Sequence, residues 1–280
     1  MIFDSFYFKN QFQFNVSFLF FFFNFGIMIK VIIIGSGNVA QHLIQAFDKS
    51  KKIDVVQVFS RQKEALSHLL DSEKITNNFN DIKQADLYII AVSDDAIAEV
   101  SSKLPFKNSL VVHTSGSVSI DALDKKNRNG IFYPLQTFSK KASVDFSQIP
   151  ICLESEKESD FEFLKKVAEI VSHNVHKINS EQRKALHVAA VFVNNFTNHL
   201  YQMGNEICEK NNVPFEILKP LIQETANKVM RLSPEEAQTG PAIRNDRQTI
   251  ARHLDFLLDE NQKKIYQLLT QSIQKNGKKL

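Results

Sequence analysis

A glycine-rich turn near the start of the chain has the residues needed to bind a phosphate group. The segment Gly35-Ser36-Gly37-Asn38-Val39-Ala40 stands between the β-branched run 29–34 and the helix-like segment 38–49. Gly35 would allow a tight turn, Gly37 would let the backbone approach a pyrophosphate, and Ala40 would let the helix pack close to the strand. The N–H groups that open the helix would then face the phosphates. We therefore predict a dinucleotide-binding turn, with an ordinary strand-to-helix turn as the alternative.

The residues after the second predicted strand, 54–59, indicate which dinucleotide is bound. Sites that prefer NAD usually carry Asp or Glu here, which accepts a hydrogen bond from the ribose 2′-hydroxyl. This chain instead carries Ser60 and Arg61, with Lys63 close by. A guanidinium can pair with two oxygens of a 2′-phosphate. We therefore predict NADP as the cofactor, with NAD less favoured; a solvent-exposed basic pair at a helix start is the alternative.

Two further predicted strands end in small residues. The strand 87–92 ends at Val92 and is followed by Ser93, and the strand 110–113 is followed by Thr114-Ser115. Because ligands bind at the carboxyl ends of strands in a doubly wound sheet, we predict that these four residues flank the nicotinamide and its ribose. Asp94 would cap the next helix in a structural interpretation. The segment 133–138 could line the mouth of a substrate site.

A long predicted helix, 181–211, carries a polar face beside its apolar stripe. Residues three, four or seven positions apart share this face: Lys184, His187, Asn194, Asn198 and Tyr201. Polar groups on such a helix need partners, which are more often side chains than ligands, so structural and functional roles both stay open for His187. The loop 239–246 adds Arg244, which is suited to an anion, while Asp246 could cap the following helix.

The pattern of segments predicts two domains. Between 28 and 179, short apolar strands alternate with helices, which is typical of a parallel sheet covered on both faces. After residue 180 the chain changes to helices, predicted at 181–211, 215–231, 248–259 and 262–274. We therefore predict an α/β domain with a doubly wound parallel sheet at 28–179 and an all-helical domain at 180–280.

Composition excludes several classes of protein. The chain has 280 residues, 43% of them hydrophobic and 23% charged, which is normal for a globular protein. Its formal net charge of +3 gives no broad field for nucleic acid. Cys152 and Cys208 lie far apart, so we expect a reducing cytoplasm. His173 and His176 have no Cys or carboxylate at ligand spacing, so the sequence predicts no metal site.

The first 27 residues differ from the rest of the chain. They contain 11 of the 24 phenylalanines but only two charged side chains, Asp4 and Lys9. The longest apolar run, 18–23, is far shorter than the roughly 20 residues that a transmembrane helix needs. The stretch also lacks the basic start and the cleavage site of a signal peptide. We expect translation to start at Met28, with a peripheral membrane anchor as the alternative.

Seven segments together resemble a known family: GSGNVA, SR, AVSDDAI, HTSGS, FYPLQTF, HVAAVFVNNFTNHL and TGPAIRND. This family comprises bacterial Rossmann-like proteins with a helical C-terminal domain of unknown function, and the resemblance covers nearly all of 28–275. The family is similar to the superfamily of pyrroline-5-carboxylate reductase, 6-phosphogluconate and β-hydroxyacid dehydrogenases and ketopantoate reductase. The resemblance implies a Rossmann domain that binds NADP, a 6-phosphogluconate-dehydrogenase-like helical domain that forms a homodimer, and a cleft between the domains. It supplies no substrate.

One departure from these relatives affects the expected mechanism. The β-hydroxyacid dehydrogenases carry a catalytic Lys with an Asn four residues later, whereas Lys184 is followed at that spacing by Val188. We hypothesise instead that His187 is the general acid, since histidine titrates near neutral pH, and that Asn194 orients the substrate. Arg244 could clamp a carboxylate, including from a partner subunit.

The predicted function is that of an NADP-dependent oxidoreductase. It would transfer hydride to or from a small anionic carbonyl or imine compound, with the cofactor supplying the hydride chemistry. A sensor or scaffold protein that binds NADP without turnover is the alternative. Neither prediction involves nucleic acid or a membrane span.

Overall fold

The computed structural model describes residues 28–139 and 144–276. The chain divides into two compact units, the first ending at Val191 and the second running from Phe192. The sequence places the join near residue 180, but helix α5 (Ser180–Ala190) belongs to unit 1. The reason is that Arg183, in the first turns of α5, bonds to the sheet domain through Ser115 and Glu154. The leader 1–27 lies outside the described residues, so its origin stays a prediction.

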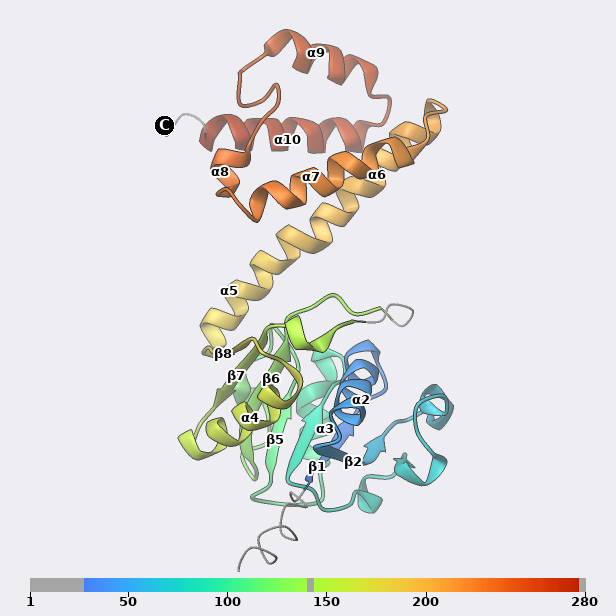
Figure 1. Ribbon diagram of the computed structural model, residues 1–280, viewed down its shortest axis with the longest axis vertical. Coiled ribbons are helices and arrows are strands. Elements are labelled where there is room, and N and C mark those ends of the chain that lie inside the picture. Colours follow the sequence, from blue (N-terminus) through green and yellow to red (C-terminus); the bar gives the residue numbers. More distant parts are fainter. Residues whose placement is uncertain (1–27, 140–143, 277–280) are drawn as a thin grey trace, which may run out of the picture. The chain divides into compact units, whose positions relative to one another are not determined.

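Unit 1 contains an eight-stranded sheet with the order β3-β2-β1-β4-β5-β6-β7-β8 (Figure 1). The strands are β1 Ile29–Ile34, β2 Ile53–Phe59, β3 Ile75–Thr76, β4 Leu87–Ile90, β5 Leu110–His113, β6 Arg128–Pro134, β7 Ile151–Ser155 and β8 Val175–Lys177. Strands β2 and β3 lie on one side of β1, and the chain then crosses to the other side of β1 to form β4. The boundary between β1 and β4 is therefore the topological switch point, at which Rossmann domains bind their ligands. The predicted α/β fold is confirmed.

One strand pairing differs from the predicted parallel sheet. Strands β6 and β7 are antiparallel, while the other neighbouring pairs are parallel. The described part of the β6–β7 connection contains only the short 3₁₀ turn η6 (Phe146–Gln148). A parallel pair needs a crossover connection, usually a helix, so this chain turns back beside the strand it has just left.

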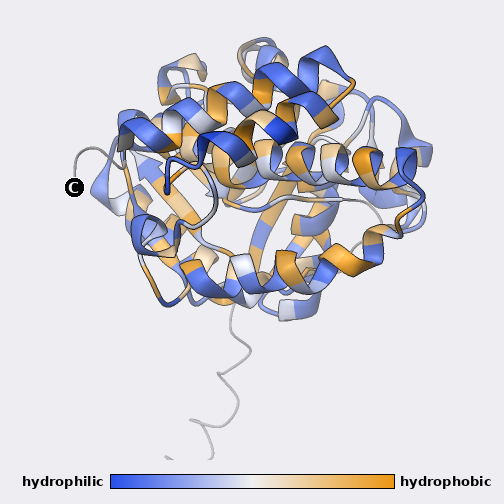
Figure 2. Cartoon of the chain, turned by 90° about the horizontal axis from the view of Figure 1, so that it is seen from above, coloured by the Kyte–Doolittle hydropathy of each residue, from blue (hydrophilic) through white to orange (hydrophobic). Residues whose placement is uncertain are grey.

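Alternate residues of the strands pack on opposite faces of the sheet. Val31 and Ile33 join a core that includes α2 (Asn38–Ser50) and α4 (Glu158–Val171). Ile32 and Ile34 join a second core with α3 (Ile97–Ser102). Figure 2 shows hydrophobic residues concentrated along the strands. The sheet is therefore covered on both faces, and the carboxyl ends of β1, β4, β5 and β6 meet at one edge.

Two predicted details of unit 1 are wrong. The helix predicted after β2 is the 3₁₀ helix η1 (Lys63–Leu66), in which only Leu66 is buried. The sequence analysis also missed β3, because two residues are too few to show an alternating pattern. Both features lie next to the edge of the sheet, where packing rather than local pattern decides the conformation.

Unit 2 is helical, as predicted. It contains the π-helical segment η7 (Val191–Phe196), shared with the end of unit 1, followed by α6 Thr197–Lys210, η8 Phe215–Leu218, α7 Lys219–Val229, α8 Pro234–Ala237, α9 Arg247–Phe256 and α10 Glu260–Asn276. The helix predicted over 181–211 is thus interrupted by η7, beside which the Thr197 hydroxyl donates to the Phe192 carbonyl oxygen at 3.2 Å. Within the described residues, no helix is both long enough and apolar enough to cross a bilayer.

Candidate active site

The turn after β1 requires a glycine at its first position. Gly35 has a φ of +135°, which disfavours residues with a side chain. A Cβ atom there would lie 2.1 Å from the carbonyl oxygen of Ala91, at the end of neighbouring β4. The chain can therefore make this turn at the switch point only because Gly35 has no side chain.

The next residues leave the N-terminus of α2 open. Gly37 is the N-cap, and neither a side-chain cap nor an acidic residue occupies the first turn. A Cβ atom built on Gly37 meets nothing within 4 Å, so the space on that side of the N-cap is open. Uncapped N–H groups and the positive helix end attract anions. The arrangement fits the diphosphate predicted from the sequence.

Several groups of this turn already have hydrogen-bond or packing partners within the protein. Ser36 accepts a hydrogen bond from the Gln41 side chain through its carbonyl oxygen, at 2.8 Å. The Asn38 amide donates to the carbonyl oxygen of Phe138 at 2.8 Å, which ties the segment after β6 to the start of α2. Val39 is half-buried and Ala40 is fully buried against the sheet. The Asn38 amide and the Ala40 methyl group are therefore engaged with the protein itself.

The end of β2 presents one exposed guanidinium. Ser60 is buried, and its hydroxyl donates to the Gln62 carbonyl oxygen at 2.7 Å. Arg61 is exposed and makes no hydrogen bond or ion pair with any described residue. Lys63, also exposed, begins η1. Of the predicted pair, Arg61 is therefore the side chain that can reach a 2′-phosphate, while Ser60 shapes the turn.

The ends of β4 and β5 lie beside the switch point. Val92 is half-buried and Ser93 is exposed, and the Ser93 hydroxyl makes no capping hydrogen bond although it precedes η4 (Asp94–Ala96). Thr114 is buried, and the buried Ser115 hydroxyl accepts from the backbone N–H of Ser117 and Val118. These four predicted cofactor residues thus stand at one edge of the sheet.

Asp94 has a different role from the one predicted. The N-cap of η4 is Ser93, and Asp94 accepts a 2.5 Å hydrogen bond from the Ser117 hydroxyl instead. Asp94 therefore joins the loop after β4 to the loop after β5. The predicted capping role was wrong because a long-range partner, invisible in the sequence, binds the carboxylate.

The imidazole of His187 lies against the loop after β5. Its Nδ1 atom is 3.1 Å from the Tyr133 hydroxyl oxygen, near the end of β6. A Cβ atom on Gly116 would lie 2.4 Å from the same Nδ1 and 2.8 Å from Cζ of Tyr133, so only glycine fits. Burial raises the pKa of Tyr133 to about 12, so its hydroxyl keeps its proton at neutral pH. The hydroxyl can donate to Nδ1 of a neutral imidazole or accept from the Nδ1–H of an imidazolium, so it is a partner for the ring in either protonation state.

Arg183, which the sequence analysis missed, holds this part of α5 in place. Its guanidinium is fully buried and donates to the Ser115 carbonyl oxygen at 2.8 Å. It also donates to the Ser180 hydroxyl at 3.0 Å and to the Glu154 carboxylate at 3.4 Å. Arg183 is one helical turn before His187 and shares its face of the helix. In the sequence it stands among charged residues, and nothing there marks it as buried.

His113, at the end of β5, is neutral. Burial lowers its pKa to about 4. The Ser115 N–H donates to its Nδ1 at 3.1 Å, so the ring proton is on Nε2, which lies 3.3 Å from the Ser119 carbonyl oxygen. His113 therefore fixes the loop that carries Ser115 and Gly116.

The other two predicted catalytic residues belong to unit 2. Asn194 is an exposed residue of η7, and Arg244 is exposed in the loop before α9. Asp246 caps α9 by accepting from the Thr249 N–H at 3.1 Å, as the structural interpretation predicts. Neither Asn194 nor Arg244 lines the cavity between α9 and α10 that is described below. Their roles stay predictions.

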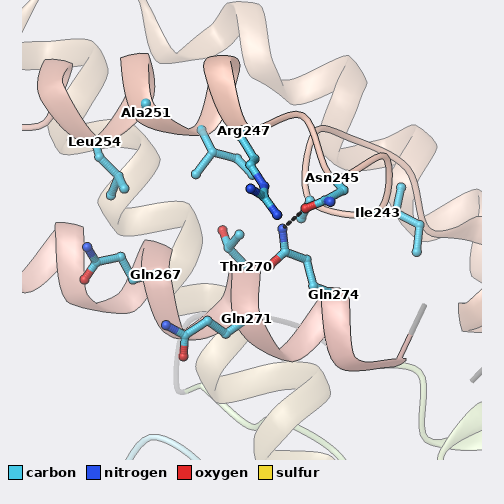
Figure 3. Close-up of a pocket in the computed structure, with 11 residues that line it drawn as sticks. Ile243, Asn245, Arg247, Ala251, Leu254, Gln267, Thr270, Gln271 and Gln274 are labelled. Atoms are coloured by element: carbon cyan, nitrogen blue, oxygen red, sulfur yellow. Dashed lines mark hydrogen bonds between the residues drawn. The ribbon is translucent and has the colours of Figure 1, made fainter. Parts of the chain in front are cut away.

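Unit 2 has a cavity of its own, of about 620 Å³, between α9, α10 and the preceding loop (Figure 3). Arg247 lines it and Arg244 does not. The sequence analysis missed this cavity because a polar helix face such as that of its lining glutamines is usually the solvent-exposed one.

The described residues contain no group of three potential metal ligands. His176 lies 2.6 Å from the Asn174 side-chain oxygen.

Known proteins match both parts of the chain. Residues 30–116 match the family model for NADP oxidoreductase coenzyme F420-dependent, and residues 149–273 match Domain of unknown function (DUF2520). A solved structure from Bacteroides fragilis, assigned as an NADP oxidoreductase, is 39% identical, with a TM-score of 0.80. The match covers 89% of this chain and 98% of that one. The chain belongs to this NADP oxidoreductase family. The predicted family, the enzyme class and NADP as cofactor are therefore confirmed.

More distant structures share the fold of this NADP oxidoreductase. The imine reductase from Pseudomonas sp. is 13% identical with a TM-score of 0.66, and the match covers 90% of this chain and 95% of that one. The pyrroline-5-carboxylate reductase from Coxiella burnetii is 13% identical with a TM-score of 0.53, covering 90% and 98%. These likenesses are of fold. The search of curated proteins finds no match.

Proposed function

We propose that the protein uses NADPH to reduce a small anionic carbonyl or imine compound. The observation that carries this proposal is the position of His187. Its imidazole touches Gly116 and Tyr133 at the carboxyl ends of β5 and β6, the edge of the sheet at which α2 begins with uncapped N–H groups. An acid–base side chain at the ligand-binding edge of a Rossmann sheet is suited to proton transfer beside a nicotinamide.

The residues proposed to hold NADP follow the edge of the sheet. The backbone of 35–40 would bind the diphosphate, because α2 begins without a side-chain cap or an acidic residue in its first turn, whereas the Gly35 N–H itself donates to the Phe59 carbonyl oxygen and fixes the turn. Arg61 would bind the 2′-phosphate through its exposed guanidinium. Val92, Ser93, Thr114 and Ser115 would border the nicotinamide and its ribose. When bound, NADPH supplies the hydride.

His187 would supply the proton. Reduction of a carbonyl or imine carbon by hydride leaves negative charge on oxygen or a lone pair on nitrogen, which then takes a proton. As an imidazolium, His187 can donate Nδ1–H to the Tyr133 oxygen and give its Nε2 proton to the substrate heteroatom, which leaves a neutral imidazole that solvent reprotonates. Tyr133 thus holds the imidazole in one orientation, as carboxylates and carbonyl groups do for other catalytic histidines.

Asn194 and Arg244 complete the proposal. Asn194 would orient the substrate, and Arg244 would bind a carboxylate, from the same subunit or a partner. The similarity of fold to an imine reductase and to pyrroline-5-carboxylate reductase favours a C=N or C=O substrate.

A homodimer through unit 2 is also proposed. Three apolar residues, Phe192, Phe196 and Leu200, recur every four residues along the chain, and 63%, 50% and 40% of their surface is exposed.

A panel of small oxo acids and cyclic imino acids tests the function. NADPH oxidation would be followed at 340 nm with the wild-type protein and with His187→Ala. We expect at least one compound to be reduced, and His187→Ala to lose roughly 100-fold or more in kcat, the low end of what a general acid contributes. Undiminished kcat in His187→Ala would overturn the assignment. Tight NADPH binding without turnover of any compound would favour a sensor.

A further inference from the structure

We propose that the cavity of unit 2 is a binding site for a small organic carboxylate, with Arg247 as its anchor. It lies between α9 and α10 and has a volume of about 620 Å³, within the range of pockets that hold small ligands. It lies wholly within unit 2 and uses none of the residues assigned above to NADP or to proton transfer. The site is therefore independent of the proposed reaction.

The charge of the lining favours an anion. Arg247 is the one charged residue among the residues that line the cavity. It makes no hydrogen bond or ion pair with any described residue, whereas Arg252, on the same helix, donates to the Thr249 hydroxyl at 3.0 Å. The nearby Asp246 carboxylate does not compensate Arg247. It accepts from the Thr249 N–H, and the cations that help to lower its pKa are Arg244 and Arg252. Arg247 thus brings to the wall of the cavity an exposed guanidinium without a carboxylate partner among the described residues, and its planar fork fits a carboxylate.

The opposite wall is polar, which distinguishes this cavity from a helix-packing surface. Gln267, Thr270, Gln271 and Gln274 line it from α10, at spacings that put them on one helix face (Figure 3). The same helix leaves Leu268 and Leu269 exposed, with 65% and 44% of their surface accessible. A helix face built to pack against protein would present leucines rather than amides. The amides and the hydroxyl offer donors and acceptors to a polar ligand.

The remaining wall accommodates a short carbon chain. Ile250, Ala251 and Leu254 of α9 line it. The Gln274 amide donates to the Asn245 side-chain oxygen at 3.1 Å, which links α10 to the loop before α9 beside Arg247 (Figure 3). A ligand with one carboxylate on Arg247, a few methylene groups on the apolar wall and a second polar group on the glutamines would satisfy all three surfaces.

Calorimetric titration of the full-length protein without NADPH tests this site. The probes are succinate, 2-oxoglutarate and glutamate, with inorganic phosphate for comparison. We expect at least one carboxylate to bind, Arg247→Gln to weaken that binding at least tenfold, and Arg252→Gln, the matched control, to leave it unchanged. Gln271→Leu, which replaces a polar wall residue by an apolar one of similar size, should also weaken it. Thermal melts would confirm that each variant is folded.

Several results would overturn the proposal. These are failure of all three carboxylates to bind, equal weakening by Arg247→Gln and Arg252→Gln, or tighter binding of phosphate than of any carboxylate. If no carboxylate binds and backbone amides of α9 and α10 gain protection from hydrogen exchange with rising protein concentration, a second copy of the chain covers the cavity instead. Because no titration includes NADPH, the result does not depend on whether the proposed reaction occurs.

Discussion

The Tyr133 hydroxyl lies 3.1 Å from Nδ1 of His187, and a Cβ on Gly116 would come within 3 Å of both side chains. Three residues from β6, α5 and the loop after β5 thus meet at one point on the ligand-binding edge of the sheet. These contacts hold His187, the proposed proton donor, against the Rossmann domain.

Removing the Tyr133 hydroxyl should slow the reaction without affecting cofactor binding. Tyr133→Phe leaves the ring in place but removes the hydrogen-bond partner of Nδ1, so that the imidazole of His187 is no longer held in one orientation. With a substrate from the panel, we expect kcat to fall about tenfold, the cost of one hydrogen bond that fixes a catalytic group. The control is Tyr266→Phe, which removes the other tyrosine–histidine hydrogen bond, to His253 at 2.8 Å. Equal kcat in wild type and Tyr133→Phe would contradict the orienting role.

Arg61 should determine the preference for NADP over NAD. The account predicts that Arg61→Ala weakens NADP binding by about tenfold to a hundredfold, since it removes a charge-assisted contact. NAD binding should not change, because NAD has no 2′-phosphate. Calorimetry with both cofactors would measure this, with Lys107→Ala as an exposed cationic control. A parallel loss of NAD affinity would show that Arg61 acts on the fold of the turn instead.

Truncating Arg183 should destabilise unit 1. Arg183→Ala removes a buried cation that binds Ser115, Ser180 and Glu154, and it leaves the partly buried Glu154 carboxylate without its guanidinium. We expect the free energy of unfolding to fall by about 3 kcal/mol, against less than about 0.5 kcal/mol for the exposed Arg252→Ala. Urea denaturation monitored by circular dichroism would compare them. If both variants unfolded at the same urea concentration, the buried network would contribute nothing.

The buried His113 should make stability depend on pH. Its pKa in the folded protein is lowered from 6.5 to about 4, so the unfolded chain takes up a proton first as the pH falls. This contribution to stability is fully present above pH 6.5 and is lost as the pH drops towards 4, to a total of about 3 kcal/mol. Denaturation of wild type and His113→Gln between pH 7 and 4.5 would measure the difference. An imidazole signal of His113 that titrates near 6.5 would refute the prediction even if the variant fails to fold.

Local sequence patterns predict much of this fold. The GxGxxA turn, the alternation of strands and helices and the helical second part depend on periodicity and backbone rules that act over a few residues. The antiparallel β6–β7 pair and strand β3 depend on pairing between distant segments, and the sequence analysis missed both, as it missed the π-helical η7.

The candidate site shows the same limit. His187 and Gly35 could be singled out by residue type and spacing. Arg183 could not, because its burial is set by Ser115 and Glu154, 68 and 29 residues away. The Asp94 role was wrong for the same reason, since its partner Ser117 comes from another strand end. Partners across the sheet are the information that one sequence does not contain.

The central claim is that the N-terminus of α2 binds the diphosphate of NADP, and Gly37 allows a direct test. A methyl group at this position meets no protein atom within 4 Å, and the backbone φ of −73° suits any residue, so Gly37→Ala should fold normally. The methyl group would occupy the space through which the diphosphate approaches. Calorimetric titration of NADPH into wild type, Gly37→Ala and the helix control Gly204→Ala decides the matter. The account predicts binding by wild type and Gly204→Ala with at least a tenfold loss in Gly37→Ala; no heat with wild type, or equal affinity in all three proteins, would contradict it.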